Sequence, residues 1–93
     1  MRIVWSRTAI DDLRAARAYI AEDDLAAAAN VARRLVEATD MLADFPGAGR
    51  AGRVPHTREL VVSGTPYIVP YRVTGDVVEI VAVLHASRRW PDR

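Results

Sequence analysis

Residues 67–85, YIVPYRVTGDVVEIVAVLH, decide the fold of this chain because they contain two apolar runs joined by a turn signal. The runs Tyr67 to Val73 and Val77 to His85 are rich in β-branched and aromatic residues, which is typical of strands. Thr74-Gly75-Asp76 joins them and contains Gly-Asp, a dipeptide that suits a two-residue hairpin turn. The stretch therefore predicts a β-hairpin. A bulge, a bend or an unpaired stretch is expected at Pro70, which has no N–H group to donate.

Two more strands are predicted outside this hairpin. After residue 56 the apolar period changes to two, so Thr57 to Val62 is predicted as a strand, and Ser63-Gly-Thr-Pro66 as the turn that follows it. Arg2 to Trp5 predicts a short first strand, with Ile3 and Trp5 on one face.

Two helices are predicted between residues 7 and 45, where apolar residues recur every three or four positions. The recurring positions are Ala9, Leu13, Ala16 and Ile20 in the first helix, and Ala28, Ala32, Leu35, Thr39 and Leu42 in the second. Ser6 and Asp24 precede the helices and are predicted N-caps, which accept from the free amides of a first turn. The first helix is expected to end around Glu22-Asp23 and the second at Phe45-Pro46-Gly47. Because so few residues separate them, the helices should form an antiparallel hairpin.

The expected element order is β-α-α-β-β-β, which is an α+β fold. The N-terminal strand and the helical hairpin would pack on one face of a mostly antiparallel, four-stranded sheet. A chain of 93 residues has room for a single domain, here residues 1–93.

Both faces of the last predicted strand are apolar. Strict alternation would place Val78, Ile80, Ala82 and Leu84 on one face, and Val77, Val81 and Val83 on the other. The helices can cover only one of these faces, and an exposed apolar patch usually marks a partner surface. A partner is therefore expected on the second face. The alternative is that the C-terminal tail or the loop 46–56 folds over it.

The composition excludes several kinds of site. Without cysteine there can be no disulfide, thiolate zinc site or cysteine nucleophile, and without lysine there can be no Schiff base. The two histidines, His56 and His85, lie far apart in sequence with no carboxylate at ligand spacing, so neither a metal nor a cofactor is expected. The net charge of +1 does not indicate a polybasic nucleic-acid binder. No signal peptide and no apolar run of ~20 residues is found, so we expect a cytoplasmic protein with no membrane partner.

The loop 46–56 contains a misleading motif. Gly47 to Gly52 spells G-x-G-x-x-G, which binds dinucleotides where a strand enters the motif and a helix follows it. Here a helix enters and a strand follows, so the match is rejected. The loop is predicted to be a flexible arm that carries Arg50 and Arg53, either as plain loop residues or as phosphate contacts.

His85, at the end of the last predicted strand, is a candidate for RNA cleavage. A histidine can move a proton near neutral pH, and guanidinium groups can hold the phosphate and its developing charge. The arginines in or beside the same strands are Arg58, Arg72 and Arg88. Glu59 is a candidate for a second proton-transfer group. Each residue also has a structural interpretation: His85 as a solvated strand end, Glu59 as a surface charge, and Arg72 as a cross-strand partner of Glu79.

Taken together, these features resemble the RelE/ParE superfamily of toxins from type II toxin–antitoxin modules. The resemblance runs nearly from end to end and rests on the order and spacing of short pieces. These pieces are Trp5-Ser6, Ala9, Asp12-Leu13, Tyr19-Ile20, Leu42, Pro46, Gly49-Arg50, Thr57-Arg58-Glu59-Leu60, Pro66-Tyr67-Ile68-Val69, Tyr71-Arg72-Val73, Val83-Leu84-His85, Arg88 and Trp90-Pro91.

The resemblance implies a bacterial toxin that inhibits growth until a cognate antitoxin wraps along its helical hairpin and sheet. Operator DNA would be bound only through the antitoxin. The target is DNA gyrase in one branch of the superfamily, and ribosome-bound mRNA in the other. Ile68 stands where the RNA-cleaving branch often has arginine, which favours the gyrase-directed, ParE-like branch. An mRNA endonuclease using His85 and arginines is an alternative, as is a degenerate toxin that only binds antitoxin.

Two sets of site residues follow. Contact with the antitoxin or the target is predicted for Leu13, Ile20, Arg50, Arg53, Tyr71, Val81, Val83 and Trp90. If the chain is a nuclease, the predicted catalytic residues are His85, Arg58, Arg72 and Arg88.

Overall fold

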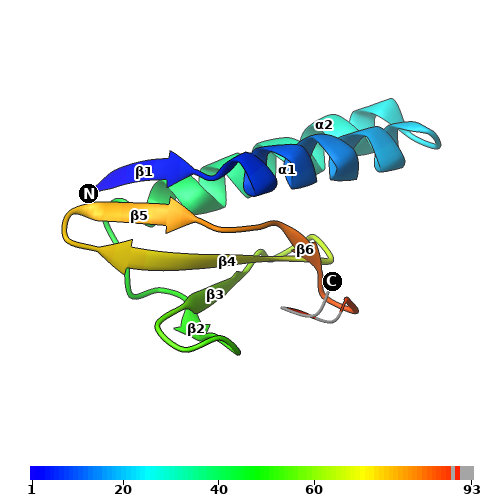
Figure 1. The fold of residues 1–93 in the computed structure, drawn as a ribbon. Coiled ribbons are helices and arrows are strands. Elements are labelled where there is room, and N and C mark those ends of the chain that lie inside the picture. Colours follow the sequence, from blue (N-terminus) through cyan, green and yellow to red (C-terminus); the bar gives the residue numbers. More distant parts are fainter. Residues whose placement is uncertain (89, 91–93) are drawn as a thin grey trace.

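The computed structural model describes residues 1–88 and Trp90, and shows two helices packed beside a sheet (Figure 1). The helices are α1 (Arg7–Ala21) and α2 (Leu25–Met41). The strands are β1 (Arg2–Trp5), β2 (Arg50–Ala51), β3 (Arg58–Val61), β4 (Tyr67–Thr74), β5 (Val77–Ile80) and β6 (Leu84–His85). The predicted α+β class is confirmed. Within the described residues, neither helix is long and apolar enough to cross a membrane.

The sheet has six strands instead of the predicted four. Its order is β1-β5-β4-β3-β2, and β6 pairs with β4 beyond the end of β5. The pairing of β1 with β5 is parallel, and all the other pairings are antiparallel. One extra strand is β2, which lies in the predicted loop 46–56. The other arises because the predicted strand Val77 to His85 is divided into β5 and β6.

The ends of the elements follow the predicted local signals. The Ser6 hydroxyl accepts from the Ala9 amide at 3.0 Å, and the Asp24 carboxylate accepts from the Ala27 amide at 3.0 Å, so both are N-caps. Gly75 and Asp76 form the turn between β4 and β5, with Gly75 in the left-handed region at φ 59°. Both predicted helices and the hairpin turn are therefore confirmed.

One face of the sheet packs against both helices and forms the main core. The strands contribute Leu60, Tyr67, Val69, Tyr71, Val78 and Ile80, the residues next to strand ends contribute Val62 and Val83, and the helices and the turn after α2 contribute Ala9, Leu35 and Leu42. Tyr71 lies fully buried at the edge of this core. Its hydroxyl donates to the Pro46 carbonyl and accepts from the Gly49 amide, both at 2.8 Å, so it holds the start of the loop 46–56 against the sheet.

Pro70 interrupts the ladder between β4 and its neighbour, as predicted. The amide of Val81 donates to the Pro70 carbonyl at 2.9 Å, but proline has no N–H group with which to return the bond. The Ser6 hydroxyl donates to the Val81 carbonyl instead, at 2.9 Å. Two residues later, the Val83 amide donates to the Asp12 carboxylate at 3.0 Å. The residues at the start of α1 therefore satisfy backbone groups that β4 leaves unpaired.

The register changes across this interruption. Tyr71 pairs with Ile80, whereas Ile68 pairs with Leu84, so three residues of one strand stand opposite two of the other. This is a β-bulge, and one extra residue reverses which face each later side chain occupies.

The predicted alternation through Val77 to His85 is therefore wrong after residue 81. Val83 joins Val78 and Ile80 in the main core, while Ala82 and Leu84 lie on the opposite face.

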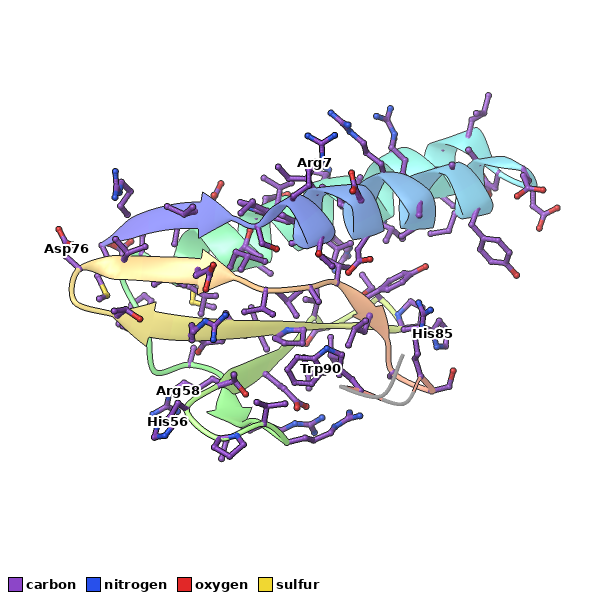
Figure 2. All side chains as sticks on the ribbon, viewed as in Figure 1. Arg7, His56, Arg58, Asp76, His85 and Trp90 are labelled. Carbon is purple, nitrogen blue, oxygen red and sulfur yellow. The ribbon has the colours of Figure 1, made fainter. Side chains whose placement is uncertain are left out.

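The second face is covered by the chain itself beside β6, so the expectation of a bare apolar face there is wrong. Ile68, Ala82 and Leu84 are each at most 2% exposed, and Val81 and Trp90 pack against them. Trp90 lies over this side of the sheet (Figure 2). The alternative, closure by the C-terminal tail, is confirmed for this cluster. A second polypeptide is not needed to bury it.

Replacing Ser6 with alanine tests the anchoring of the bulge. Loss of the hydroxyl removes the N-cap of α1 and leaves the half-buried Val81 carbonyl without its donor. The free energy of unfolding should therefore fall by about 1–3 kcal/mol. The measurement is chemical denaturation. Ser63→Ala, in the exposed turn after β3, is the control and should change stability by less than about 0.5 kcal/mol. Equal stabilities for the two variants would contradict the proposed anchoring.

Candidate functional site

A groove lies at one end of the sheet, between α1 and β6. Its volume is about 380 Å³. The lining residues are Asp12, Ala15, Ala16, Tyr19, Tyr67, Val83, His85, Ser87 and Arg88. This groove, called the His85 groove below, brings together two phenols, an imidazole and a guanidinium.

His85 is exposed at the mouth of this groove, and its ring is oriented by two neighbours. The imidazole meets the Tyr67 ring edge-on, with centroids 5.7 Å apart and an interplanar angle of 77°. Its Nδ1 atom accepts from the Ser87 amide at 3.2 Å and lies 2.8 Å from the Ser87 hydroxyl. Because Nδ1 is an acceptor, the neutral ring carries its proton on Nε2.

Tyr67 forms the inner wall of the His85 groove and is 8% exposed. Burial raises the pKa of the Tyr67 phenol, and repulsion from the Tyr19 phenolate raises it further. The Asp12 carboxylate, which also lines the groove, accepts from the Val83 amide at 3.0 Å. Of the predicted catalytic residues, the groove therefore contains His85 and Arg88.

The structure does not bring Arg58 or Arg72 to His85. Arg58 pairs with Tyr71 and His85 pairs with Tyr67, so the two positions are four residues, or about 13 Å, apart along β4. Figure 2 shows Arg58 and His85 well separated. Arg58 donates to the Gly49 carbonyl at 2.9 Å, and Arg72 pairs with Glu79 at 2.6 Å, as the cross-strand interpretation predicted.

Glu59 has a role that differs from both of its sequence interpretations. It is 1% exposed, so it is neither a surface charge nor a proton-transfer group open to a substrate. Its carboxylate accepts from the Arg53 amide at 2.9 Å and forms ion pairs with Arg50 and Arg53, both at 3.4 Å. These contacts hold the loop 46–56 to the sheet, so the loop is not a free arm. The available signal in the sequence was a lone acid within the predicted strand Thr57 to Val62, downstream of two arginines in the loop.

The other predicted contact residues divide by exposure. Tyr71 is fully buried and Val83 is 4% exposed, so neither presents its side chain to a partner in this fold. Val81 and Trp90 are half-buried against the second-face cluster. Ile20 is half-buried against the main core.

Leu13 is also half-buried against the main core, and it lines a second groove, on the outer side of the two helices. This hairpin groove has a volume of about 490 Å³. It is lined by Leu13, Ala29, Ala32 and Val36, with Arg14, Arg17, Arg33 and Glu37 also contributing. Arg33 is paired with Glu37 at 2.7 Å. Arg14 and Arg17 form no ion pair with any described residue, so the groove is apolar with a net positive rim. Sequence analysis did not select these two arginines because each falls on an exposed helix position.

No group of three or more histidine and acidic side chains suited to a metal occurs among residues 1–88 and 90.

Comparison with known proteins gives consistent similarities. Residues 3–90 match the family described as the ParE toxin of the type II toxin-antitoxin system parDE. The chain is 49% identical over 90 residues to Y4kP of Sinorhizobium fredii, covering 97% of this chain and 93% of that protein. It is 41% identical over 87 residues to Toxin RelE2 of Caulobacter vibrioides, covering 94% and 97% of the two chains. A chain of the chromosomal ParDE TA system from P. aeruginosa superposes with a TM-score of 0.81 at 30% identity, covering 91% of this chain and 95% of that one.

The raised pKa of Tyr67 predicts a loss of stability at high pH. The unfolded chain releases this proton near pH 10, before the folded chain does, so stability should fall as the pH rises from about 10 through the folded pKa. Tyr67→Phe should remove this part of the decline, as measured by denaturation midpoints between pH 8 and 11. Tyr19→Phe, at an exposed position, is the control and should retain most of it. An unchanged pH profile in Tyr67→Phe would contradict this origin.

Proposed function

Because this chain belongs to the ParE toxin family of type II toxin–antitoxin systems, we propose that it arrests growth by binding DNA gyrase, without chemistry of its own. Its partner before activation is a cognate antitoxin. The gyrase assignment is supported by the disposition of the arginines, because a nuclease needs several of them beside its proton-transfer group.

Most of the candidate arginines are engaged elsewhere in the fold. Arg50 and Arg53 pair with the buried Glu59, and along β4 Arg58 lies about 13 Å and Arg72 about 17 Å from His85. Holding a phosphate through in-line cleavage requires donors aimed at the developing charge, in place before the reaction. The fold supplies one described arginine, Arg88, at the His85 groove. Recognition of a protein target needs no such convergence.

RNA cleavage is the second candidate, and one observation favours it. The His85 groove combines an oriented imidazole with Arg88 and the phenols of Tyr19 and Tyr67, a set that can move protons and stack on bases. A third possibility is a degenerate toxin that binds its antitoxin and has no target.

Two assays on the purified toxin distinguish these functions. We expect inhibition of supercoiling by gyrase with transcripts left intact, and we expect His85→Gln to change the inhibition by less than about threefold, since an exposed strand end is rarely essential to a large interface. Antitoxin binding by His85→Gln serves as the folding control. Cleaved transcripts, together with loss of cleavage in His85→Gln, would contradict the gyrase assignment and assign RNA cleavage to the toxin. If the toxin affects neither process but still binds antitoxin, the degenerate assignment is correct.

We also propose that the hairpin groove receives an amphipathic segment of the antitoxin that carries acidic side chains. The small side chains of Ala29 and Ala32 allow close approach of a partner backbone, and the unpaired Arg14 and Arg17 complement negative charge. The inclusion of Leu13 among the predicted antitoxin contacts agrees with this position.

Reversing the two rim charges tests the groove. Arg14→Glu with Arg17→Glu should weaken antitoxin binding at least about tenfold, because like charges would then face each other across the interface. Arg2→Glu with Arg7→Glu makes the same change in net charge outside the groove, and should weaken binding less than about threefold at 0.15 M salt, where distant charges are screened. The measurement is calorimetric titration. Equal losses in the two double variants would place the antitoxin elsewhere.

A further inference from the structure

A small hollow lies near the loop 46–56, at a part of the sheet remote from the His85 groove. Its volume is about 290 Å³, close to the lower limit of small-ligand sites. Its lining residues are Ala51, His56, Thr57, Arg58, Arg72 and Val73. His56 and Arg58 lie side by side in Figure 2. Three residues whose side chains can carry positive charge therefore line one hollow, although the sequence places them in a loop and two separate strands.

The turn that carries His56 has an unusual backbone. The Thr57 amide donates to the Val54 carbonyl at 3.2 Å, which closes a four-residue turn with Pro55 second and His56 third. His56 has a φ of 67°, in the left-handed region, where the third position of such a turn normally carries glycine. The turn is held to the neighbouring strand by the Gly52 amide, which donates to the Thr57 carbonyl at 2.8 Å. His56 therefore holds a backbone conformation that costs a histidine more than it would cost glycine, and such strain is often found at functional sites.

The two arginines are fixed but still have donors to offer. One terminal nitrogen of Arg58, Nη1, donates to the Gly49 carbonyl at 2.9 Å and to the Gly47 carbonyl at 3.4 Å. The Nε atom of Arg72 donates to Glu79 at 2.6 Å. In the described part of the chain, Nη2 of Arg58 and both terminal nitrogens of Arg72 meet no acceptor. In each guanidinium group, one nitrogen is therefore fixed by a hydrogen bond to the protein, and at least one other nitrogen is available to donate.

The charge around the hollow remains positive. None of its six lining residues carries a carboxylate, and the nearby Glu59 is already engaged by Arg50 and Arg53. Glu79 forms an ion pair with Arg72 and compensates its charge. Among the lining residues, the positive charge of Arg58 remains without a carboxylate partner.

We propose that this hollow binds a phosphate group, either free or in a nucleic-acid backbone. Phosphate oxygens match the paired N–H groups of guanidinium, and the imidazole of His56, which lines the same hollow, can donate as well. This site is separate from the His85 groove and does not depend on whether gyrase or RNA is the target.

Titration of the purified chain with inorganic phosphate, followed by amide chemical shifts, tests the proposal. We expect saturable changes centred on residues 51–58 and 72–73. Arg72→Gln should weaken binding about tenfold or more, since it removes charge-assisted hydrogen bonds, and Arg72→Lys should weaken it less. Arg7→Gln, on the exposed surface of α1, is the matched control and should leave the affinity within about twofold.

His56→Gly separates binding from folding. Glycine adopts the left-handed φ without strain, so this variant should be at least as stable as the original chain and yet bind phosphate several-fold more weakly. A stable His56→Gly variant with undiminished affinity would remove the imidazole from the site.

A second titration, with a single-stranded oligonucleotide that lacks terminal phosphates, identifies the source of the group. Saturable shifts at the same residues, competing with inorganic phosphate, would assign the hollow to a nucleic-acid backbone. Saturation by inorganic phosphate alone would assign it to free phosphate. Non-saturable shifts with both probes, or equal losses in Arg72→Gln and Arg7→Gln, would overturn the proposal.

Discussion

The missing N–H group of Pro70 is the constraint on which the arrangement of the sheet depends. In a strand, the N–H and C=O groups of one residue point to the same neighbour, and the Pro70 carbonyl accepts from Val81. The reciprocal bond cannot form, so the ladder between β4 and β5 ends there. The Val81 carbonyl is satisfied by Ser6 and the Val83 amide by Asp12. The residues that begin α1 are thereby tied to a break in a strand more than seventy residues later in the chain.

The bulge also decides what each face of the sheet presents. It turns Val83 toward the helices, and turns Leu84 toward a second cluster that the tail closes with Trp90. It places His85 beside Tyr67, at the end of the sheet next to α1. The described surfaces are thus sorted into an aromatic groove at one end, a basic hollow near the loop 46–56, and an apolar groove with arginines on the outer side of the helices.

The buried carboxylate of Glu59 organises the charges of the loop. Two exposed arginines fold back onto it, and a loop with three glycines between residues 47 and 52 acquires a fixed position. Arg50 and Arg53 therefore have a different role from Arg58 and Arg72, although all four follow α2 in the chain. The first pair stabilises the fold, and the second retains donors that face outward.

Much of this structure could be predicted from local sequence. The N-caps at Ser6 and Asp24, the two apolar helical stripes, the hairpin turn at Gly75-Asp76 and the irregularity at Pro70 all depend on residues close together in the chain, whose preferences act within one or two turns. The family resemblance rested on the same short pieces. Local sequence could not predict three other features: the face occupied by Val83, the closure of the second cluster by Trp90, and the burial of Glu59. They depend on a one-residue change of register, and on which distant groups meet once the strands have paired, since backbone groups left without a partner in one strand can be satisfied by any element that packs beside them.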